Sequence, residues 1–365
     1  MRGRRLAAAA LLVTLGLAVR GWVAHTGFEP EPVSASPRVG FSYSPHAVVG
    51  QDPVAGLRTL LDRLQPDVVR LPVYWPDVAP EPSRLDFSTV DSLVSAVTAH
   101  NRSARKHQTR LVLVVGIRNL GFPEVWVPDW VQRTGSTDLS ELAGTPAYLA
   151  YLQAAITRYA ANGLLLAWQV ENEPFDDVTS GRRGSVALSA EAIDQQIRIV
   201  RQLDGEHPIV VTTYNSATLA LDRAAASRWS WLYRLLPAPQ PAGHPDLALG
   251  TADVLGLDAY VVTPSTPLEE ASASERIGWK TAALAYWAEE AEKQDKQMWI
   301  MEMQAAPWAG VSGFTPEELL HSARLYRQAG AAVVLLWGVE SWLQDPAWML
   351  AGRHAVWALR PPRAR

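Results

Sequence analysis

Short apolar runs recur along the chain from residue 38 onward, and they alternate with segments whose apolar residues follow helical spacing. Most of the runs are nearly continuous in apolar residues, which is typical of parallel strands buried on both faces. The predicted strands are 38–44, 67–73, 110–117, 164–172, 208–214, 252–261, 297–303 and 331–338.

Helices are predicted between these strands. Thr145 and Thr315 are each followed by a proline, which gives a polar N-cap and then proline at the first helical position. Glu318 completes a capping box with Thr315. Seven intervening helices are clear, and the tail can supply an eighth. Apolar residues at helical spacing support two of them: Leu57, Leu60, Leu61 and Leu64, then Val90, Leu93, Val94 and Val97.

Repeated βα units predict an α/β fold with a parallel sheet, and eight of them favour a single closed (β/α)₈ TIM barrel over residues 38–360. The alternative is an open doubly wound sheet. However, no glycine-rich phosphate loop follows the first strand. A chain of 365 residues with 48% apolar residues has enough apolar surface for one large core, and no second domain boundary is visible.

The N-terminus has the pattern of a targeting segment. Arg2, Arg4 and Arg5 precede the apolar stretch 6–19, which is shorter than the ~20 residues of a membrane span. Residues 1–24 are therefore predicted to be a signal peptide or an N-terminal membrane anchor, and 25–37 a proline-rich linker. Either alternative predicts a secreted or extracytoplasmic barrel, tethered to the membrane if the segment is retained.

Composition excludes several classes of function. The net charge of −4 gives no electrostatic case for binding nucleic acid. The absence of cysteine excludes disulfides, thiolate metal sites and cysteine nucleophiles. The eight histidines form no HxH or HExxH spacing, and neither a GxSxG elbow nor a P-loop occurs. No metal or cofactor is expected.

Polar and aromatic residues gather where the predicted strands end, which is where the active site of this barrel lies. Two carboxylates are central. Glu302 sits in an apolar strand and needs a partner, for which Arg70 and Tyr260 are the natural candidates. Glu173 ends the fourth strand, across the barrel mouth from the seventh. An alternative for Glu302 is a purely structural buried pair with Arg70.

Two converging carboxylates suit the cleavage of a glycosidic bond. Arg70 would keep Glu302 ionised, as a nucleophile requires. Glu173, next to Pro174 and facing the negative Glu302, is expected to have a raised pKa and to act as acid/base. Glu171, the rival to Glu173, is expected to face the same side one layer deeper, as support, with the role of the acid as its alternative.

The segment WQVENEP (168–174) resembles the strand-4 motif of clan A glycoside hydrolases, retaining barrel enzymes that include cellulase-like family 5 and β-galactosidase-like relatives. The resemblance continues in YWPDVAPEPSRLDFSTVDSLV (74–94) and covers about residues 38–340. It implies that Glu173 is the acid/base and Glu302 the nucleophile. It also implies that the sugar is bound by Asn172, Arg70, Tyr260 and Trp337.

The sequence thus predicts a retaining hydrolase that cleaves O-glycosidic bonds of an oligo- or polysaccharide by double displacement. Trp75, Asn119 and Trp126 are further candidates for sugar binding, with core or rim packing as the alternative for the two tryptophans. Glu340, beyond the eighth strand, is a rival to Glu302. The alternative function is a non-catalytic carbohydrate-binding or envelope scaffold barrel. The hydrolase and the carbohydrate-binding barrel both predict a carbohydrate partner, whereas an envelope scaffold predicts no affinity for sugars.

Overall fold

A computed structural model describes residues 36–103, 108–121, 124–132, 138–176, 187–214, 219–226, 243–262, 271–308 and 313–360. The predicted targeting segment and nearly all of the predicted linker lie outside these ranges. Within them, no helix has both the length and the apolar character needed to cross a membrane.

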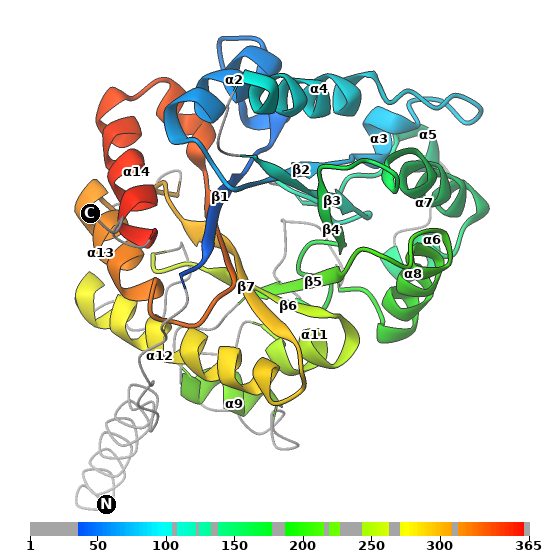
Figure 1. Ribbon diagram of the computed structural model, residues 1–365. Coiled ribbons are helices and arrows are strands. Elements are labelled where there is room, and N and C mark those ends of the chain that lie inside the picture. The colour runs from blue at the N-terminus through cyan, green and yellow to red at the C-terminus, as the bar shows by residue number, and fades with distance from the viewer. Residues whose placement is uncertain are drawn as a thin grey trace, which may run out of the picture.

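Eight parallel strands close into a barrel in the order β1 to β8, and helices surround it (Figure 1). The predicted (β/α)₈ barrel is confirmed. Every strand lies within a predicted apolar run or extends one residue past it. The strands are β1 (Arg38–Ser42), β2 (Val68–Pro72), β3 (Arg110–Val115), β4 (Leu165–Val170), β5 (Ile209–Tyr214), β6 (Val254–Ala259), β7 (Gln297–Gln304) and β8 (Val333–Trp337).

The helices follow the predicted pattern, and the tail supplies the last one. Thr145 and Glu318 make the expected capping hydrogen bonds with the backbone. The helices are η1 (Pro45–Ala47), α2 (Pro53–Leu64), α3 (Trp75–Val78), α4 (Ser88–Ser103), α5 (Asp129–Gln132), α6 (Leu139–Ala143), α7 (Pro146–Tyr159), α8 (Ala190–Leu203), α9 (Leu219–Ala226), α11 (Pro245–Thr251), α12 (Ala273–Glu292), α13 (Pro316–Tyr326), η2 (Val339–Leu343) and α14 (Pro346–Leu359).

Both faces of the strands are buried, which explains the continuous apolar runs. The outer face packs against the helices. The inner face forms a separate cluster within the barrel, which includes Val112, Val210, Trp299 and Met301. The barrel is therefore filled by side chains, and polar groups gather only toward the end of the strands where the chain leaves them.

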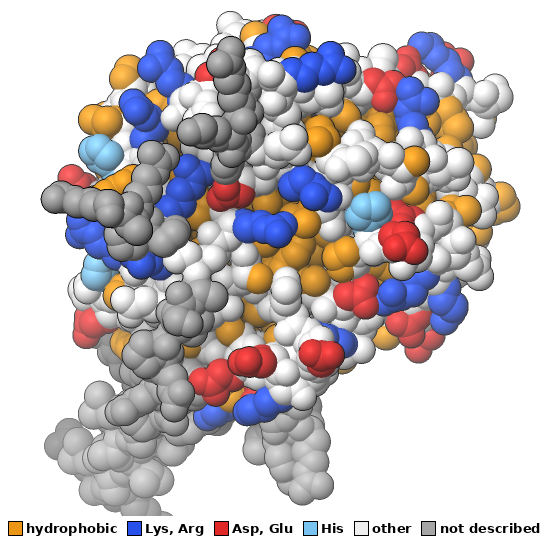
Figure 2. Space-filling model, in the orientation of Figure 1, with side chains coloured by type: hydrophobic (Ala, Val, Ile, Leu, Met, Phe, Trp, Pro, Cys, Tyr) orange, Lys and Arg blue, Asp and Glu red, His pale blue; other side chains and the backbone are white. Residues whose placement is uncertain are grey.

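The surface carries both signs of charge. On the face that Figure 2 shows, acidic and basic side chains are interspersed among hydrophobic and uncharged ones. This distribution fits the small net charge of −4.

Two helical glycines offer a matched test of the packing. A Cβ at Gly352 in α14 would lie 2.1 Å from Cζ3 of Trp342, whereas a Cβ at Gly278 in α12 would meet nothing within 4 Å. We expect Gly352→Ala to lower the free energy of unfolding by about 1–3 kcal/mol because it overpacks the core. Gly278→Ala should raise it by about 0.5–1 kcal/mol, since alanine favours the helix. Urea unfolding measures both, and equal effects would contradict the packing.

Candidate active site

Glu302 is held by two side chains, one from β2 on another side of the barrel and one that follows the neighbouring strand β6. Arg70 of β2 donates a hydrogen bond to one carboxylate oxygen, and the hydroxyl of Tyr260, which follows β6, donates to the other. Arg70 is fully buried and Glu302 is 4% exposed. The predicted pairing is thus confirmed, and a guanidinium and a phenol together hold this carboxyl in place.

A β-bulge in β7 determines where Glu302 points. Ile300 pairs with Leu257 of β6, but the next pair is Glu302 with Asp258, so that Met301 is skipped. Met301 belongs to the interior cluster, so strict alternation would turn Glu302 toward the helices. The bulge re-aims Glu302 to the mouth of the barrel, where Arg70 meets it.

A glutamine connects this pair to the end of β4. Gln169 accepts a hydrogen bond from Nη1 of Arg70 at 3.1 Å, and its amide nitrogen donates to Oδ1 of Asn172 at 3.0 Å. Thr212 of β5 accepts from the backbone N–H of Glu173 at 2.9 Å. Sequence reasoning missed Gln169, although a polar residue inside an apolar strand was a usable signal.

Glu173 lies in a buried and negatively charged environment. It is 6% exposed, and its φ of 46° turns the chain sharply after β4. Burial raises the pKa of Glu173 well above its usual value, and the negative charges of Glu124, Asp176, Asp258 and Glu302 raise it further. Glu173 is therefore protonated in the pH range where an isolated glutamate is ionised, as an acid catalyst requires.

Arg118 is a second buried cation, which the sequence analysis did not identify. Its Nη2 lies 3.0 Å from Oε2 of Glu124 and 4.0 Å from Oε2 of Glu173, and its Nη1 donates to the backbone oxygen of Asp176. This guanidinium gives Glu173 a more distant cation than Arg70 gives Glu302. The two carboxyls therefore differ in environment.

Two further acids complete the cluster. Asp176 accepts hydrogen bonds from the Thr213 hydroxyl and the Tyr214 N–H, and burial raises its pKa to about 7. Asp258 is fully buried, and neither of its carboxyl oxygens has a hydrogen-bond partner among the described residues. Burial and the charge of Glu302 raise the pKa of Asp258 well above its usual value. A neutral Asp258 relieves part of the repulsion in the cluster.

Aromatic rings flank Tyr260. Trp337 at the end of β8 contacts it edge-on at 5.3 Å between ring centroids, and Tyr214 stacks on it at 5.9 Å. Trp308 lies 5.4 Å from Tyr260 and 5.1 Å from Trp337. The structure thus brings Trp337 to the site, as predicted, and adds Trp308, whose position after β7 was not recognised.

Trp75 and Asn119 are placed differently from what the sequence suggested. Trp75 is fully buried and packs on Tyr148 and Tyr151 of α7, with ring centroids 5.2 and 6.1 Å away. Asn119 is also fully buried, and its amide bonds the backbone of Val114 and Leu120. Both positions correct the expectation of sugar binding, because neither side chain is free to meet a ligand.

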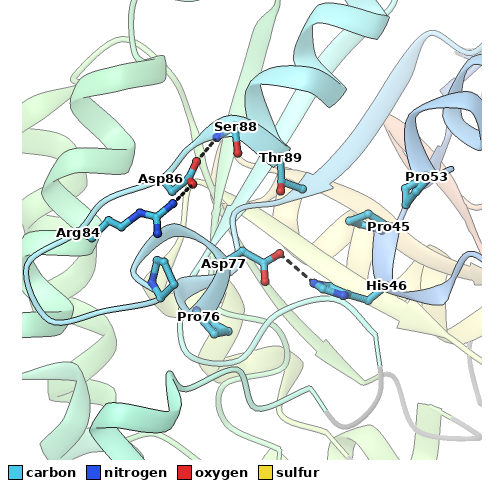
Figure 3. Close-up of a pocket in the computed structure, with 10 residues that line it drawn as sticks. Pro45, His46, Pro53, Pro76, Asp77, Arg84, Asp86, Ser88 and Thr89 are labelled. Carbon is cyan, nitrogen blue, oxygen red and sulfur yellow. Dashed lines mark hydrogen bonds and ion pairs between the residues drawn. The ribbon is translucent and has the colours of Figure 1, made fainter.

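Trp126 is partly buried and contacts His46, which lines a surface cavity of about 540 Å³. Its ring stacks on His46 at 5.1 Å and lies 4.2 Å from Tyr74. His46 and Asp77 line the cavity, and a hydrogen bond of 2.8 Å joins Nε2 of His46 to Oδ2 of Asp77 (Figure 3). Hydrogen bonding to Asp77 raises the pKa of His46. The placement of Trp126 leaves its predicted role in sugar binding a proposal.

Glu171 does not face the same side as Glu173, which corrects the sequence expectation. Its φ of 60° turns the side chain away from the barrel mouth. Oε1 accepts a hydrogen bond from Tyr148 of α7 at 3.1 Å, and Oε2 accepts one from the N–H of Arg118 at 2.6 Å. Glu171 therefore supports the site from the layer between the strands and the helices.

Among the described residues, no three His, Cys, Asp or Glu side chains are grouped as a metal site would require. The acids at the mouth are instead arranged around arginine and tyrosine. Their arrangement suits proton transfer and nucleophilic attack by carboxyl groups.

No protein-family model and no curated protein matches this chain. Among solved structures, GH5_18 from Streptomyces cattleya in complex with GlcNAc is 17% identical with a TM-score of 0.62, over 91% of this chain and 83% of that one. A variant of it in complex with Manβ1-4GlcNAc is also 17% identical with a TM-score of 0.62, over 90% of this chain and 83% of that one. Native xylanase 10B from Thermotoga maritima is 13% identical with a TM-score of 0.54, over 88% of this chain and 95% of that one. At these identities the likeness establishes the barrel fold.

Glu171 generates a prediction about stability. Burial raises its pKa from 4.5 to about 7. The folded state then binds more protons than the unfolded state between these values, so stability falls as pH rises from 4.5 to 7. We expect Glu171→Gln to remove this loss. Relative to the native protein, the variant should gain about 2–3 kcal/mol of unfolding free energy between pH 4.5 and 8.

Urea unfolding at several pH values measures this difference. The control is Glu206→Gln, an exposed acid before β5, at the opposite end of the barrel. A difference between Glu171→Gln and the native protein that stays constant with pH would contradict the assignment.

Proposed function

We propose that this protein is a retaining glycoside hydrolase, with Glu302 as the nucleophile and Glu173 as the acid/base. The observation that carries the proposal is the contrast between the two carboxyls. Glu302 is paired with Arg70 and Tyr260, whereas Glu173 has a pKa well above its usual value in the same buried cluster. One ionised and one protonated carboxyl is what the first step of double displacement needs.

In that step Glu302 attacks the anomeric carbon while Glu173 gives its proton to the leaving glycosidic oxygen. The bond to the leaving group breaks, and a glycosyl ester forms on Glu302. Arg70 and Tyr260 fix the attacking carboxylate in place, which lowers the entropic cost of reaching the transition state. Asn172, which Gln169 orients through its Oδ1, is available to a sugar hydroxyl.

In the second step Glu173, now ionised, removes a proton from water as the water attacks the anomeric carbon. Glu302 departs, and the sugar keeps its original configuration after two inversions. Retention predicts carboxyl groups about 5–5.5 Å apart in the working enzyme. The burial of Glu173 favours the return of the proton before the next cycle.

The structural neighbours support this proposal and suggest substrates. One is in complex with GlcNAc, another with Manβ1-4GlcNAc, and a third is named a xylanase. Aryl β-mannosides, β-xylosides and β-glucosides therefore form the first test panel. The alternative is a non-catalytic carbohydrate-binding barrel, which would bind oligosaccharides without hydrolysing any member of the panel.

We also propose that the barrel acts outside the cytoplasmic membrane. The basic residues before an apolar stretch at 6–19 and the prolines at 30, 32 and 37 support a targeting segment and a linker. Fractionation of cells that express the full chain tests this, and recovery of the active barrel in the cytoplasm alone would contradict it.

Glu302→Ala should lower kcat by about 10⁴-fold or more, because the covalent route needs this carboxylate. Added azide can take the place of the missing nucleophile, so the product expected is a glycosyl azide of inverted configuration. Product analysis by NMR checks the configuration. Near-native turnover by a folded Glu302→Ala protein would show that another residue is the nucleophile.

Glu173→Ala should slow substrates with poor leaving groups strongly, while the first step with a 2,4-dinitrophenyl glycoside is largely spared. In the native enzyme, activity should fall as pH rises through the raised pKa of Glu173, because the acid must be protonated. This alkaline limb should disappear in Glu173→Ala. Its persistence in the pH profile of kcat/KM would assign the acid role elsewhere.

A further inference from the structure

A second cavity opens beside Trp337, at the end of β8. Its volume is about 420 Å³, within the range of small-molecule sites. It lies among the segments that follow β1, β3, β7 and β8. The helix η1 separates it from the His46 cavity, since Pro45 lines one and Ala47 the other. Its lining combines an aromatic ring, hydroxyls, an amide and one acid. These residues are Trp337, Ser42, Ser44, Gln344 and Glu340.

The turn after β8 brings Glu340 to this cavity. Gly338 has a φ of 88°, a left-handed conformation that favours glycine, and a Cβ there would lie 2.8 Å from that of Ala306. The turn leads directly into η2, where Glu340 is the second residue. Trp337 and Glu340 thus border one cavity, although a regular continuation of the strand would separate them.

The buried carboxyl of Glu340 is stabilised by backbone N–H groups, those of Ser44 and of Glu340 itself. One oxygen accepts a hydrogen bond from the N–H of Ser44, and the residue is 8% exposed. Within the described ranges, no cation lies at ion-pair distance from it. Burial raises its pKa to about 7. Hydroxyl donors from a ligand in the cavity would stabilise the ionised form.

Several contacts connect the cavity to Glu302. Trp337 lies edge-on against Tyr260, whose hydroxyl binds Glu302. The hydroxyl of Ser42 donates to the backbone oxygen of Met301, the residue before Glu302, at 3.0 Å. The negative charge of Glu302 also contributes to the raised pKa of Glu340. The cavity is therefore connected to the Glu302 site through Trp337 and Ser42.

We infer, on the basis of the proposed function, that Glu340 is a specificity-determining residue whose carboxylate binds a hydroxyl of the sugar that Glu302 attacks. The ring of that sugar lies on Trp337, and the lining of the cavity selects which hydroxyls are accepted. The acid that the sequence offered as a rival to the nucleophile is thereby assigned to substrate recognition. A purely structural Glu340 would only anchor the chain after β1 through Ser44.

A double-mutant cycle between protein and substrate separates these two roles. The kcat/KM values of native protein, Glu340→Ala and Glu340→Gln are measured with the best aryl glycoside and with its 2-, 3-, 4- and 6-deoxy analogues. Removing the hydroxyl at one position should lower the kcat/KM of the native protein about 10- to 100-fold, as expected when a charge-assisted hydrogen bond is lost. Glu340→Ala should lower kcat/KM for the parent glycoside by a similar factor. Removing the same hydroxyl should then lower the kcat/KM of Glu340→Ala little further.

Glu340→Gln keeps the shape and an acceptor for Ser44, so it decides the question if Glu340→Ala does not fold. Its kcat/KM for the parent glycoside should be about 5- to 10-fold lower than that of the native protein. Removing the same hydroxyl should again have a smaller effect than it has in the native protein. Glu206→Gln should match the native protein at every position. Equal deoxygenation losses in the native protein and both Glu340 variants would overturn the inference.

Binding distinguishes failure of this inference from failure of the proposed function. Glu302→Ala protein, with and without Glu340→Gln, is titrated calorimetrically with Manβ1-4GlcNAc and with xylobiose. A Kd raised at least fivefold by Glu340→Gln supports the inference even if the native protein hydrolyses nothing. An unchanged Kd, or no binding of either sugar, overturns it even if turnover is found.

Discussion

The ion pair between Arg70 and Glu302 is the interaction on which the rest of the site depends. Each charge is buried at the mouth of a filled barrel, and an unpaired charge there would cost several kcal/mol. The pair joins β2 to β7 across the barrel, and Gln169 extends it to β4. Tyr260 occupies the second oxygen of Glu302. The carboxylate is thus fixed in orientation before any ligand arrives, which would reduce the reorganisation needed in the proposed reaction.

The same burial makes the two central carboxyls chemically different. Glu302 has a guanidinium and a phenol in contact, whereas Glu173 has Arg118 only at 4.0 Å and acids on several sides. Environment rather than residue type therefore distinguishes these two glutamates. Asp258, with no hydrogen-bond partner among the described residues, belongs to the same balance, because a crowded cluster with few cations retains protons.

Local departures from regular backbone position the functional groups. The bulge in β7 turns Glu302 inward, and left-handed residues after β4 send Glu171 toward the helices while Glu173 stays at the mouth. The left-handed conformation of Gly338 likewise turns the chain after β8 and so positions Glu340. Such features cost conformational energy, which the packed barrel around them offsets. They are concentrated at the ends of strands, where a rigid scaffold supports them.

The repeating apolar pattern by itself determined the eight strands, the helices between them and the barrel, because periodicity and capping are local properties that tertiary packing did not override. It also indicated the partner of Glu302, since a charge within an apolar strand needs an opposite charge and Arg70 was the one available. Tertiary structure alone decided that Glu171 faces the helices, that Trp75 belongs to the core and that Gln169 links the strands. Those outcomes depend on a single backbone rotation or on contacts between residues far apart in the chain, and neither leaves a periodic signal in the sequence.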